Sequence, residues 1–448
     1  MRRFSSMGFL KKFTKQEISW MMYDWANSAH SVIVVTILPI FFDTVAGYTA
    51  DSVSSMSTWG FATSLAMAIV ALSAPFLGVF GDIRGMRKKL FTAFMLIGVV
   101  SVAGLSFTPF MDFTASPDAA GRVAAIVLVL YITSTIGFDA SCIYYDAFLT
   151  DVTTEDRMDS VSTLGYGLGY IGGSTIPLLI FLIMNAVGVP MLTCLGFIFG
   201  LTAVWWLVFS VPLVKNCEQT SGKPYKKGDV GASIKNVFTT MKEIGADKPM
   251  LIYIISYFFY IDGVYTIIEM STAYGKDVGI GDSSMLLALL LTQVVAFPCS
   301  ILFGKLARRF ESEKLILVCI GAYFLIALFA LQLDTAWKFW FLATCVGVFQ
   351  GAIQALSRSY YAKIIPKEKA SEYFGVFDIF GKGASFLGTM LMGISTQLFH
   401  TSKAGVVMIA ALFVLGFVTF CLQGRQAQKG AQAQSVNPAQ QKLQTQNL

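Results

Sequence analysis

Charged side chains are scarce in this 448-residue sequence. Asp, Glu, Lys and Arg together make up 13% of the residues, whereas 55% are hydrophobic and the mean hydropathy is +0.65. This composition excludes a soluble globular protein and places most of the chain in a lipid bilayer. The net charge of +6 does not indicate nucleic-acid binding, because the basic residues occur in short clusters between apolar segments.

Side chains that bind metals or form disulfides are also few. The sequence has two histidines and seven cysteines, and the cysteines are isolated residues without a CxxC pair. This pattern supports neither a zinc site nor a disulfide framework, and favours cysteines that act as small buried hydrophobic residues. We therefore expect no cofactor and no metal.

Long apolar segments account for most of the chain. A membrane-spanning helix needs about 20 mostly apolar residues. Segments of that length form two sets of six, separated by a hydrophilic stretch, which predicts an all-α integral membrane protein with 12 transmembrane helices in a 6+6 arrangement. The predicted spans are 20–46, 58–80, 89–110, 122–149, 160–184, 190–214, 249–273, 284–304, 314–333, 337–361, 372–397 and 404–422.

The distribution of basic residues supports this segmentation. With the N-terminus in the cytoplasm, 28 of the 33 Lys and Arg residues fall on the cytoplasmic side, as the positive-inside rule requires. We expect two six-helix halves, residues 1–214 and 249–422, joined by a cytoplasmic linker, residues 215–248. Residues 423–448 are rich in Gln and Ala and have no apolar period, so we expect a disordered cytoplasmic tail.

The first apolar segment carries a polar stripe. Four residues spaced at i, i+3, i+4 and i+7 share one helical face: Asp24, Asn27, Ser28 and Ser31. A carboxylate in a bilayer costs about 2.5 to 3.5 kcal/mol, so this face must meet protein, water or substrate. The stripe predicts a helix-packing face or one wall of a translocation path. His30 is a candidate proton relay, although a single histidine is more often a packing residue.

The first helix of the second half carries a stripe with the same spacing. Its members are Asp262, Tyr265, Thr266 and Glu269. Matching stripes on the first helices of two halves are expected of parallel repeats about an axis along the membrane normal. We therefore expect Asp24 and Asp262 to line one central cavity.

Other spans add polar residues to the interior. Six acids face only two bases within the spans, so some acids must be protonated or must bind a cation. Asp378 and Lys382, spaced at i and i+4, can also neutralise each other. The candidate substrate and proton pathway comprises Asp24, Asn27, Ser28, His30, Asp139, Asp262, Tyr265, Glu269, Gln354 and Lys382, with Asp146, Arg358 and Asp378 as secondary candidates.

A loop rich in glycine and basic residues separates the second and third predicted helices. Its acid, Asp82, can accept hydrogen bonds from a neighbouring helix end, and its basic residues hold the loop on the cytoplasmic side. The stretch resembles the GxLaDRxGRk loop motif of the major facilitator superfamily, which implies a gating loop, with topology anchoring as the alternative. The gating candidates are Gly78, Asp82, Arg84, Gly85 and Arg87. In the second half Arg308 replaces the acid, so that copy of the motif is degenerate.

The resemblance can be narrowed to one branch of this superfamily. Tyr23–Ser28 is similar to the YDWANS signature of the vacuole effluxer-like family, which is named after a fungal vacuolar amino-acid exporter. Further stretches that resemble motifs of the family are 145–151, 262–267, 357–366 and 372–388. The resemblance implies a secondary transporter of small polar metabolites, amino acids first, that works by alternating access.

Gly167–Gly172 fits the GxGxxG pattern of dinucleotide-binding proteins. That pattern has meaning only after a strand and at the start of a soluble helix, whereas here it lies inside an apolar span. It therefore predicts a closely packed helix face.

Other functions fit the sequence less well. A membrane-embedded enzyme needs a metal or phosphate site, and a non-transporting sensor needs a larger soluble module than the linker or tail provides. Transport of another solute class, such as a sugar, nucleoside or drug, remains an alternative. We expect a monomer in the bacterial inner membrane, with both termini in the cytoplasm. Its expected partners are the lipid bilayer, a small-molecule substrate and protons as a candidate coupling ion, and not nucleic acid.

Overall fold

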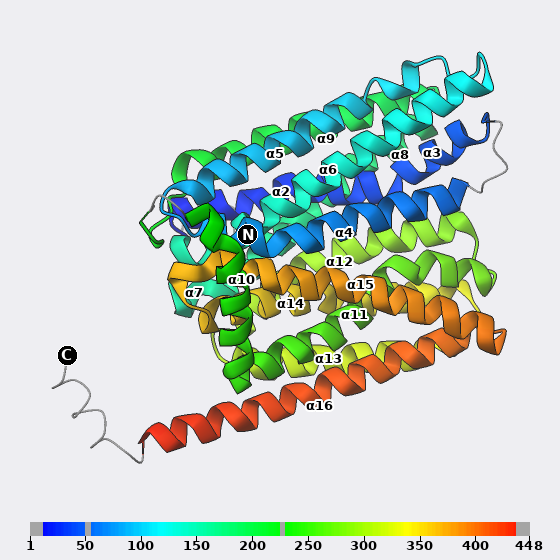
Figure 1. Cartoon of the computed structure of the whole chain (residues 1–448). Coiled ribbons are helices and arrows are strands. Elements are labelled where there is room, and N and C mark those ends of the chain that lie inside the picture. The colour runs from blue at the N-terminus through cyan, green and yellow to red at the C-terminus, as the bar shows by residue number, and fades with distance from the viewer. Residues whose placement is uncertain (1–11, 50–54, 225–228, 436–448) are drawn as a thin grey trace, which may run out of the picture.

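The computed structural model describes residues 12–49, 55–224 and 229–435. Long helices run side by side along one axis (Figure 1). The first six spans are α2 (Lys15–Thr36) with α3 (Leu38–Ala46), α4 (Ser55–Gly81), α5 (Met86–Leu105), α6 (Pro117–Val152), α7 (Glu155–Leu168) with η2 (Gly169–Thr175) and α8 (Ile176–Ala186), and α9 (Met191–Asn216).

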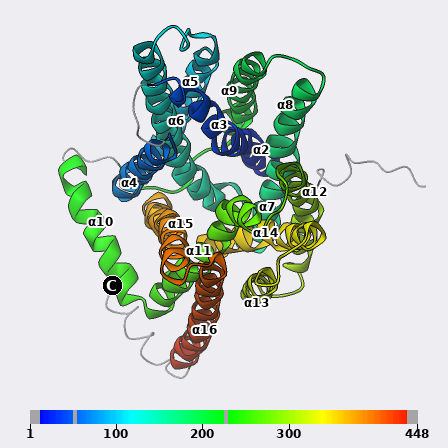
Figure 2. The ribbon, with the colours of Figure 1, turned by 90° about the vertical axis from the view of Figure 1, so that its right-hand side faces the viewer.

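The remaining spans follow a short helix, α10 (Asp229–Ala246), which lies across the axis of the bundle (Figure 1). They are α11 (Lys248–Asp277), α12 (Asp282–Leu306), α13 (Ser312–Ala330), α14 (Ala336–Ile364), α15 (Ala370–Phe399) and α16 (Ser402–Ser435). Figure 2, viewed along the bundle, shows α2–α9 gathered on one side and α11–α16 on the other. We call these groups the first half and the second half.

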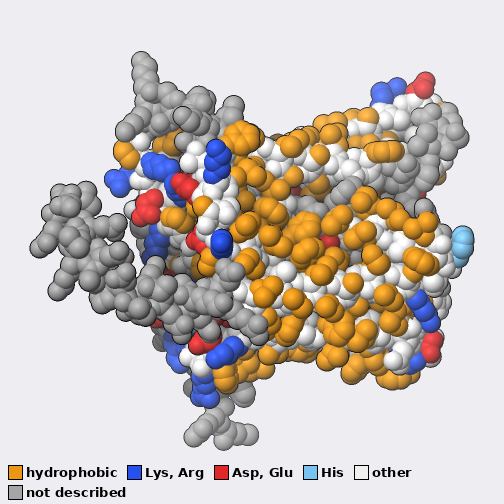
Figure 3. Space-filling model, turned by 60° about the horizontal axis from the view of Figure 1, so that its bottom comes forward, with side chains coloured by type: hydrophobic (Ala, Val, Ile, Leu, Met, Phe, Trp, Pro, Cys, Tyr) orange, Lys and Arg blue, Asp and Glu red, His pale blue; other side chains and the backbone are white. Residues whose placement is uncertain are grey.

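The surface of the bundle is that of a membrane protein. Eleven of the described helices are long and apolar enough to cross a bilayer, and α15 completes the set of 12. Large apolar side chains such as Phe61 and Leu72 are 74% exposed. In Figure 3 apolar side chains cover the middle of the visible face, whereas charged side chains gather towards its two ends. The predicted all-α fold with 12 transmembrane helices is confirmed.

The glycine-rich part of the fifth span packs against α2, as predicted. A Cβ atom on Gly173 would lie 2.6 Å from the carbonyl oxygen of Trp25 and 2.7 Å from Cβ of Ser28. Only glycine permits this approach, and the segment forms a π-helical turn, η2, at the same place. The contact fixes the face of α2 that carries Asp24.

The linker and the tail contain more helix than the sequence analysis predicted. The linker, expected only to be hydrophilic, includes α10. The tail was expected to be disordered from residue 423, but α16 continues to Ser435, and residues 436–448 lie outside the described part of the chain. Ala, Gln, Arg and Lys all have high helix propensities, so the apolar span continues as a polar helix. We call the end of the bundle that carries α10 and residues 217–224 the linker end.

Candidate functional site

A buried cluster of charges joins the two halves around Arg358. This residue lies on α14 and is 3% exposed. Its guanidinium donates to Asp24 Oδ2 on α2 at 3.1 Å and to Asp146 Oδ1 on α6 at 3.1 Å. The arginine of the second half therefore neutralises carboxylates that belong to the first half.

Further contacts from the first half surround the Arg358 guanidinium. Its Nε donates to Ser162 Oγ at 3.0 Å, and its Nη2 donates to the Ser162 carbonyl at 3.2 Å. Trp20, Tyr145 and Tyr166 present their rings to the guanidinium carbon, with centroids 4.7, 5.3 and 4.4 Å away. Aromatic faces attract a cation, and desolvation strengthens that attraction. The planar guanidinium is thus bound by hydrogen bonds and by ring faces.

Asp262 lies in a different environment. It is fully buried between α11 and α15, and its Oδ1 accepts from the Gly388 backbone N–H at 2.8 Å and from Thr266 Oγ1 at 3.3 Å. Its Oδ2 is buried and has no hydrogen-bond partner among the described side chains. A Cβ atom on residue 388 would collide with the Asp262 carboxylate, so the glycine permits the contact. Asp262 is therefore bound to backbone within its own half, whereas Asp24 is bound to a cation across the two halves.

The other predicted residues of α2 pack against the first half. Asn27 Nδ2 lies 3.7 Å from Cys142 Sγ, and Ser28 Oγ donates to the Asp24 carbonyl at 2.7 Å. His30 is 3% exposed, and its ring centroid lies 4.7 Å from that of Phe138 in a stacked arrangement. The surroundings of His30 are those of a packing residue.

The remaining predicted pathway residues lie in several places. Asp139 is buried on α6, and Glu269 is exposed on α11. Tyr265 is half-buried on α11. Gln354 Nε2 approaches the Tyr170 hydroxyl of the first half at 3.4 Å.

The predicted pair on α15 can be placed only in part. Asp378 is half-buried, and its charge acts on Asp146 of the first half. Lys382 lies on α15, but its side chain is outside the described set. The structure therefore leaves their predicted mutual neutralisation as a prediction.

The loop between α4 and α5 contacts the start of α15. Asp82 accepts hydrogen bonds from the backbone N–H groups of Ser371 at 2.8 Å and Glu372 at 2.9 Å. These amides belong to the first turn of a helix, where free N–H groups and the helix dipole favour an anion. Burial raises the pKa of the Asp82 carboxyl above its usual value, and Arg87 and the two amides oppose that rise.

Arg87 connects three elements at the same position. It is fully buried, pairs with Asp82 at 2.9 Å, donates to Ser371 Oγ at 2.9 Å and also pairs with Asp151 at the end of α6. Gly85 adopts a left-handed φ of 81°, which a side chain would strain, and begins α5.

Gly78 and Arg84 complete the predicted loop. The backbone at Gly78 packs against Ser371 and Glu372, so a side chain at position 78 would collide with α15. Arg84 is exposed, and its backbone N–H donates to the Lys223 carbonyl of the linker at 2.9 Å. All five predicted loop residues thus lie at the linker end, where the loop meets the second half or the linker.

The corresponding loop of the second half also contacts the opposite half. Arg308 Nε donates to Ser160 Oγ at 3.0 Å, and that hydroxyl donates to the Gly304 carbonyl at 3.1 Å. Asp159 beside it accepts from Ser359 at 2.6 Å and from Lys363 at 2.5 Å. The second-half loop has a base, Arg308, where the first-half loop has an acid, but it still contacts the opposite half. The acid at this contact is Asp159 on α7.

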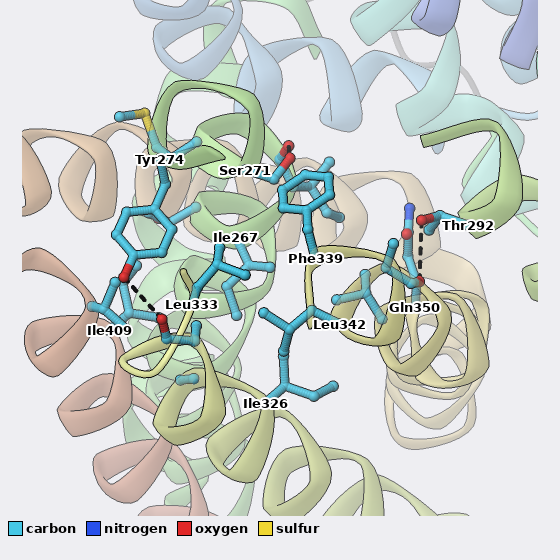
Figure 4. Close-up of a pocket in the computed structure, with 18 of the residues that line it drawn as sticks. Ile267, Ser271, Tyr274, Thr292, Ile326, Leu333, Phe339, Leu342, Gln350 and Ile409 are labelled. Carbon is cyan, nitrogen blue, oxygen red and sulfur yellow. Dashed lines mark hydrogen bonds between the residues drawn. The ribbon is translucent and has the colours of Figure 1, made fainter. Parts of the chain in front are cut away.

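A cavity of about 120 Å³ lies within the second half. Figure 4 shows Thr292 and Gln350 at one side of it and Tyr274 at the other. The residues that line it are uncharged and mostly apolar. Since α11 begins at the linker end, the lining residues 266–274 place the cavity towards the opposite end. Gln350 and Arg358 lie about 12 Å apart along α14.

Sequence reasoning did not single out several residues of these clusters. They include Ser162, Asp159 and the aromatic ring Trp20, and Arg358 was only a secondary candidate. Asp151 had a signal, because it ends the motif-like stretch 145–151. Ser162, Asp159 and Trp20 gave none, since their partners lie far away in sequence, as with Ser162 and Arg358, 196 residues apart. Within the described residues no group of three His, Cys, Asp or Glu side chains is arranged to hold a metal.

Comparison with known sequences gives a consistent result. Residues 150–434 match the family model described as vacuole effluxer Atg22 like. The chain is 42% identical to an uncharacterized MFS-type transporter, YxiO, of Bacillus subtilis, over 91% of this chain and 95% of that protein. It is 21% identical to autophagy-related protein 22-1 of Aspergillus fumigatus over 57% of this chain, and the match spans 46% of the fungal protein.

Solved structures with the same fold are transporters. The proton:xylose symporter XylE aligns with a TM-score of 0.65 at 13% identity, over 90% of this chain and 93% of XylE. FucP in its outward conformation aligns with a TM-score of 0.69 at 12% identity, over 91% of this chain and 98% of FucP. At these identities the likeness is one of fold.

Proposed function

Because the chain belongs to the vacuole effluxer Atg22-like family of the major facilitator superfamily, we propose that it moves small polar metabolites, amino acids first, across the membrane by alternating access. The membership makes it an integral membrane transporter and not an enzyme. We also propose that protons are the coupling ion and that both termini lie in the cytoplasm.

The observation that carries the proposal is the Arg358 cluster between the halves. Alternating access requires the halves to separate at one end while they close at the other. Asp24 and Asp146 can separate from Arg358 only if their charges are satisfied in another way, by a proton, by water or by a substrate. The cluster is therefore a contact whose stability depends on what is bound.

The contacts between halves support a state closed at the linker end. Asp82 with α15, Asp159 with Lys363 and Arg308 with Ser160 all join the halves there. The cavity towards the opposite end is lined by residues of the second half alone, so the contacts at the linker end carry this assignment. With the linker end in the cytoplasm, this arrangement corresponds to an outward-facing transporter in the plasma membrane.

Charge balance supports coupling to protons. Two carboxylates, Asp24 and Asp146, share a single guanidinium, so the cluster has a net negative charge when all its groups are ionised. In a low-dielectric interior such an excess favours uptake of one proton or binding of one cation. A substrate ammonium group can serve the same purpose, which is why amino acids come first.

An uptake screen tests this function. Purified protein in liposomes would be given labelled amino acids, sugars and nucleosides, with and without a pH gradient. We expect accumulation of at least one amino acid that increases with the gradient. Accumulation of a sugar or a nucleoside alone would show that the substrate is not an amino acid. Uptake that does not depend on the pH gradient would show that transport is not coupled to protons.

Thiol labelling tests the orientation. With the native cysteines as background, a cysteine at position 403 should react with an impermeant reagent from outside intact cells, and one at position 225 should not. Positions 51 and 430 give a second pair, reactive and unreactive respectively, and 51 and 225 lie outside the described residues. Labelling at 225 in intact cells would reverse the assignment.

A further inference from the structure

The helix α10 has an exposed apolar side that the bundle does not use. Phe238 is 61% exposed and Met241 is 48% exposed, whereas Val237, Thr240 and Ile244 are buried against the bundle. The helix therefore has two apolar sides, one packed on protein and one uncovered. Apolar side chains left uncovered on a helix beside a membrane bundle are typical of a lipid contact.

The position of α10 places this side at the bilayer surface. The helix crosses the bundle axis at the linker end (Figure 1), and in the view along the bundle it lies at the periphery, outside α4 and α15 (Figure 2). It contacts α4, α11 and α15. A helix in this place lies parallel to the membrane plane, at the edge of the region that the spans occupy.

Its hydrogen bonds determine which side faces the lipid. Glu243 pairs with Lys369, which precedes α15 and so lies beyond the start of that span. With 3.6 residues per turn, Phe238 and Met241 lie roughly 140° and 160° around the helix from Glu243. They therefore point away from the solvent side of the linker end and towards the bilayer.

We propose that α10 is an interfacial helix whose Phe238 and Met241 side chains insert into the headgroup region of the surrounding bilayer. Exposed Thr239 occupies the water-facing side, about 40° around the helix from Glu243, whereas exposed Lys242 follows Phe238 by one helical turn. The same helix holds the start of α15, because Thr240 donates to Glu372 at 2.6 Å. Glu372 in turn supplies a backbone amide to Asp82. The helix α10 thus connects the bilayer surface with the start of α15, which binds the loop between α4 and α5. This arrangement does not depend on the identity of the substrate.

Quenching by brominated lipids tests this proposal. Phe238→Trp and Met241→Trp add one indole each to the intact chain, and Thr239→Trp adds one on the polar side as a matched control. Each protein would be placed in vesicles of phosphatidylcholine and phosphatidylglycerol, with or without bromine near the headgroup end of the acyl chains. Subtracting the unmodified protein removes the signal of the seven native tryptophans.

We expect the indoles at 238 and 241 to lose about half of their added emission in brominated vesicles and the indole at 239 to lose little. Equal quenching at all three positions would overturn the orientation. Blue-shifted but unquenched emission at 238 and 241 would show a protein contact, such as a second copy, and would overturn the lipid assignment. Red-shifted, unquenched emission would show that water covers this side and would also overturn it.

Discussion

Asp24 and Asp262 occupy matching places in the two polar stripes of the sequence, yet they bind different partners. Asp24 pairs with Arg358 across the halves, whereas Asp262 accepts from Gly388 and Thr266 within the second half. The contact of Asp24 must break when the halves separate at the linker end, and that of Asp262 can persist. Asp262 also lies deeper in its helix, 14 residues after Lys248, than Asp24, nine residues after Lys15. A repeated sequence pattern therefore does not give its residues equivalent chemistry.

The largest expected effect comes from breaking the partner of Asp24. Arg358→Gln leaves the buried Asp24 carboxylate and the half-buried Asp146 carboxylate without this base, which costs about 3 to 5 kcal/mol. If that cost falls on the closed state, uptake of the substrate found in the screen should decrease about 100-fold or more. Initial rates in proteoliposomes would measure it.

Two further variants make the test specific. Arg309→Gln removes an exposed arginine and should leave uptake nearly unchanged. Arg358→Lys keeps the charge but loses the planar guanidinium and its stacking on the aromatic rings. Its uptake rate should therefore lie between those of Arg358→Gln and Arg309→Gln. Uptake by Arg358→Gln that equals that of Arg309→Gln would show that the cluster has no part in the cycle.

The next effect distinguishes the two acids. Asp24→Asn fixes the neutral form, so it should abolish accumulation driven by a pH gradient while some exchange remains. Asp262→Asn keeps an oxygen for Gly388 and should reduce accumulation less, by about threefold or less. Accumulation and counterflow in the same vesicles separate coupling from binding.

The reverse order of effects would assign the coupling role to Asp262. Normal accumulation in both variants would move that role to Asp139, to Glu269 or to no proton at all. Either result would change the comparison of the two acids and leave the fold unaffected.

The loop between α4 and α5 should show an intermediate effect. Asp82→Asn weakens the attraction to the first turn of α15 and the pairing with Arg87, so the state closed at the linker end becomes less stable. We expect turnover to fall about tenfold while equilibrium affinity changes less than about twofold. Arg84→Gln, at an exposed position in the same loop, is the control. A large loss of affinity with normal exchange would make Asp82 part of a binding site.

The sequence predicted the fold better than the site for a physical reason. Hydropathy and the positive-inside rule act on each segment separately, so the spans and their apolar surface follow from local composition. Ion pairs such as Asp24 with Arg358 form only after the two halves pack together. The polar stripes predict that a residue such as Asp24 faces the protein interior, but they do not predict which residue it binds.

The linker illustrates the same limit. Residues 229–246 carry apolar residues at helical spacing, at positions 230, 234, 237, 238, 241 and 244, but the segment is too short and too polar to be a membrane span, so the search for spans left it in a hydrophilic linker. The helix is stabilised by contacts with the bundle, including Thr240 with Glu372. Such tertiary stabilisation is not visible in a local pattern.

The smallest effect is expected at the histidine of α2. His30 stacks on Phe138 and lies 5.1 Å from the ring of Trp206, and its Nε2 approaches Ser134 Oγ at 3.3 Å. His30→Phe keeps a planar ring in this aromatic setting and loses one long hydrogen bond, which costs about 1 kcal/mol. Uptake and its pH dependence should therefore stay within about twofold of the parent.

His30→Ala serves as the contrasting variant, because it removes the ring and leaves a cavity. It should lower the unfolding temperature more than His30→Phe does, while the pH dependence of uptake stays the same. A packing role predicts this division between stability and pH response. Loss of gradient-driven accumulation in His30→Phe, at normal stability, would instead make His30 a proton relay and would place two titratable groups on the same helix in the coupling path.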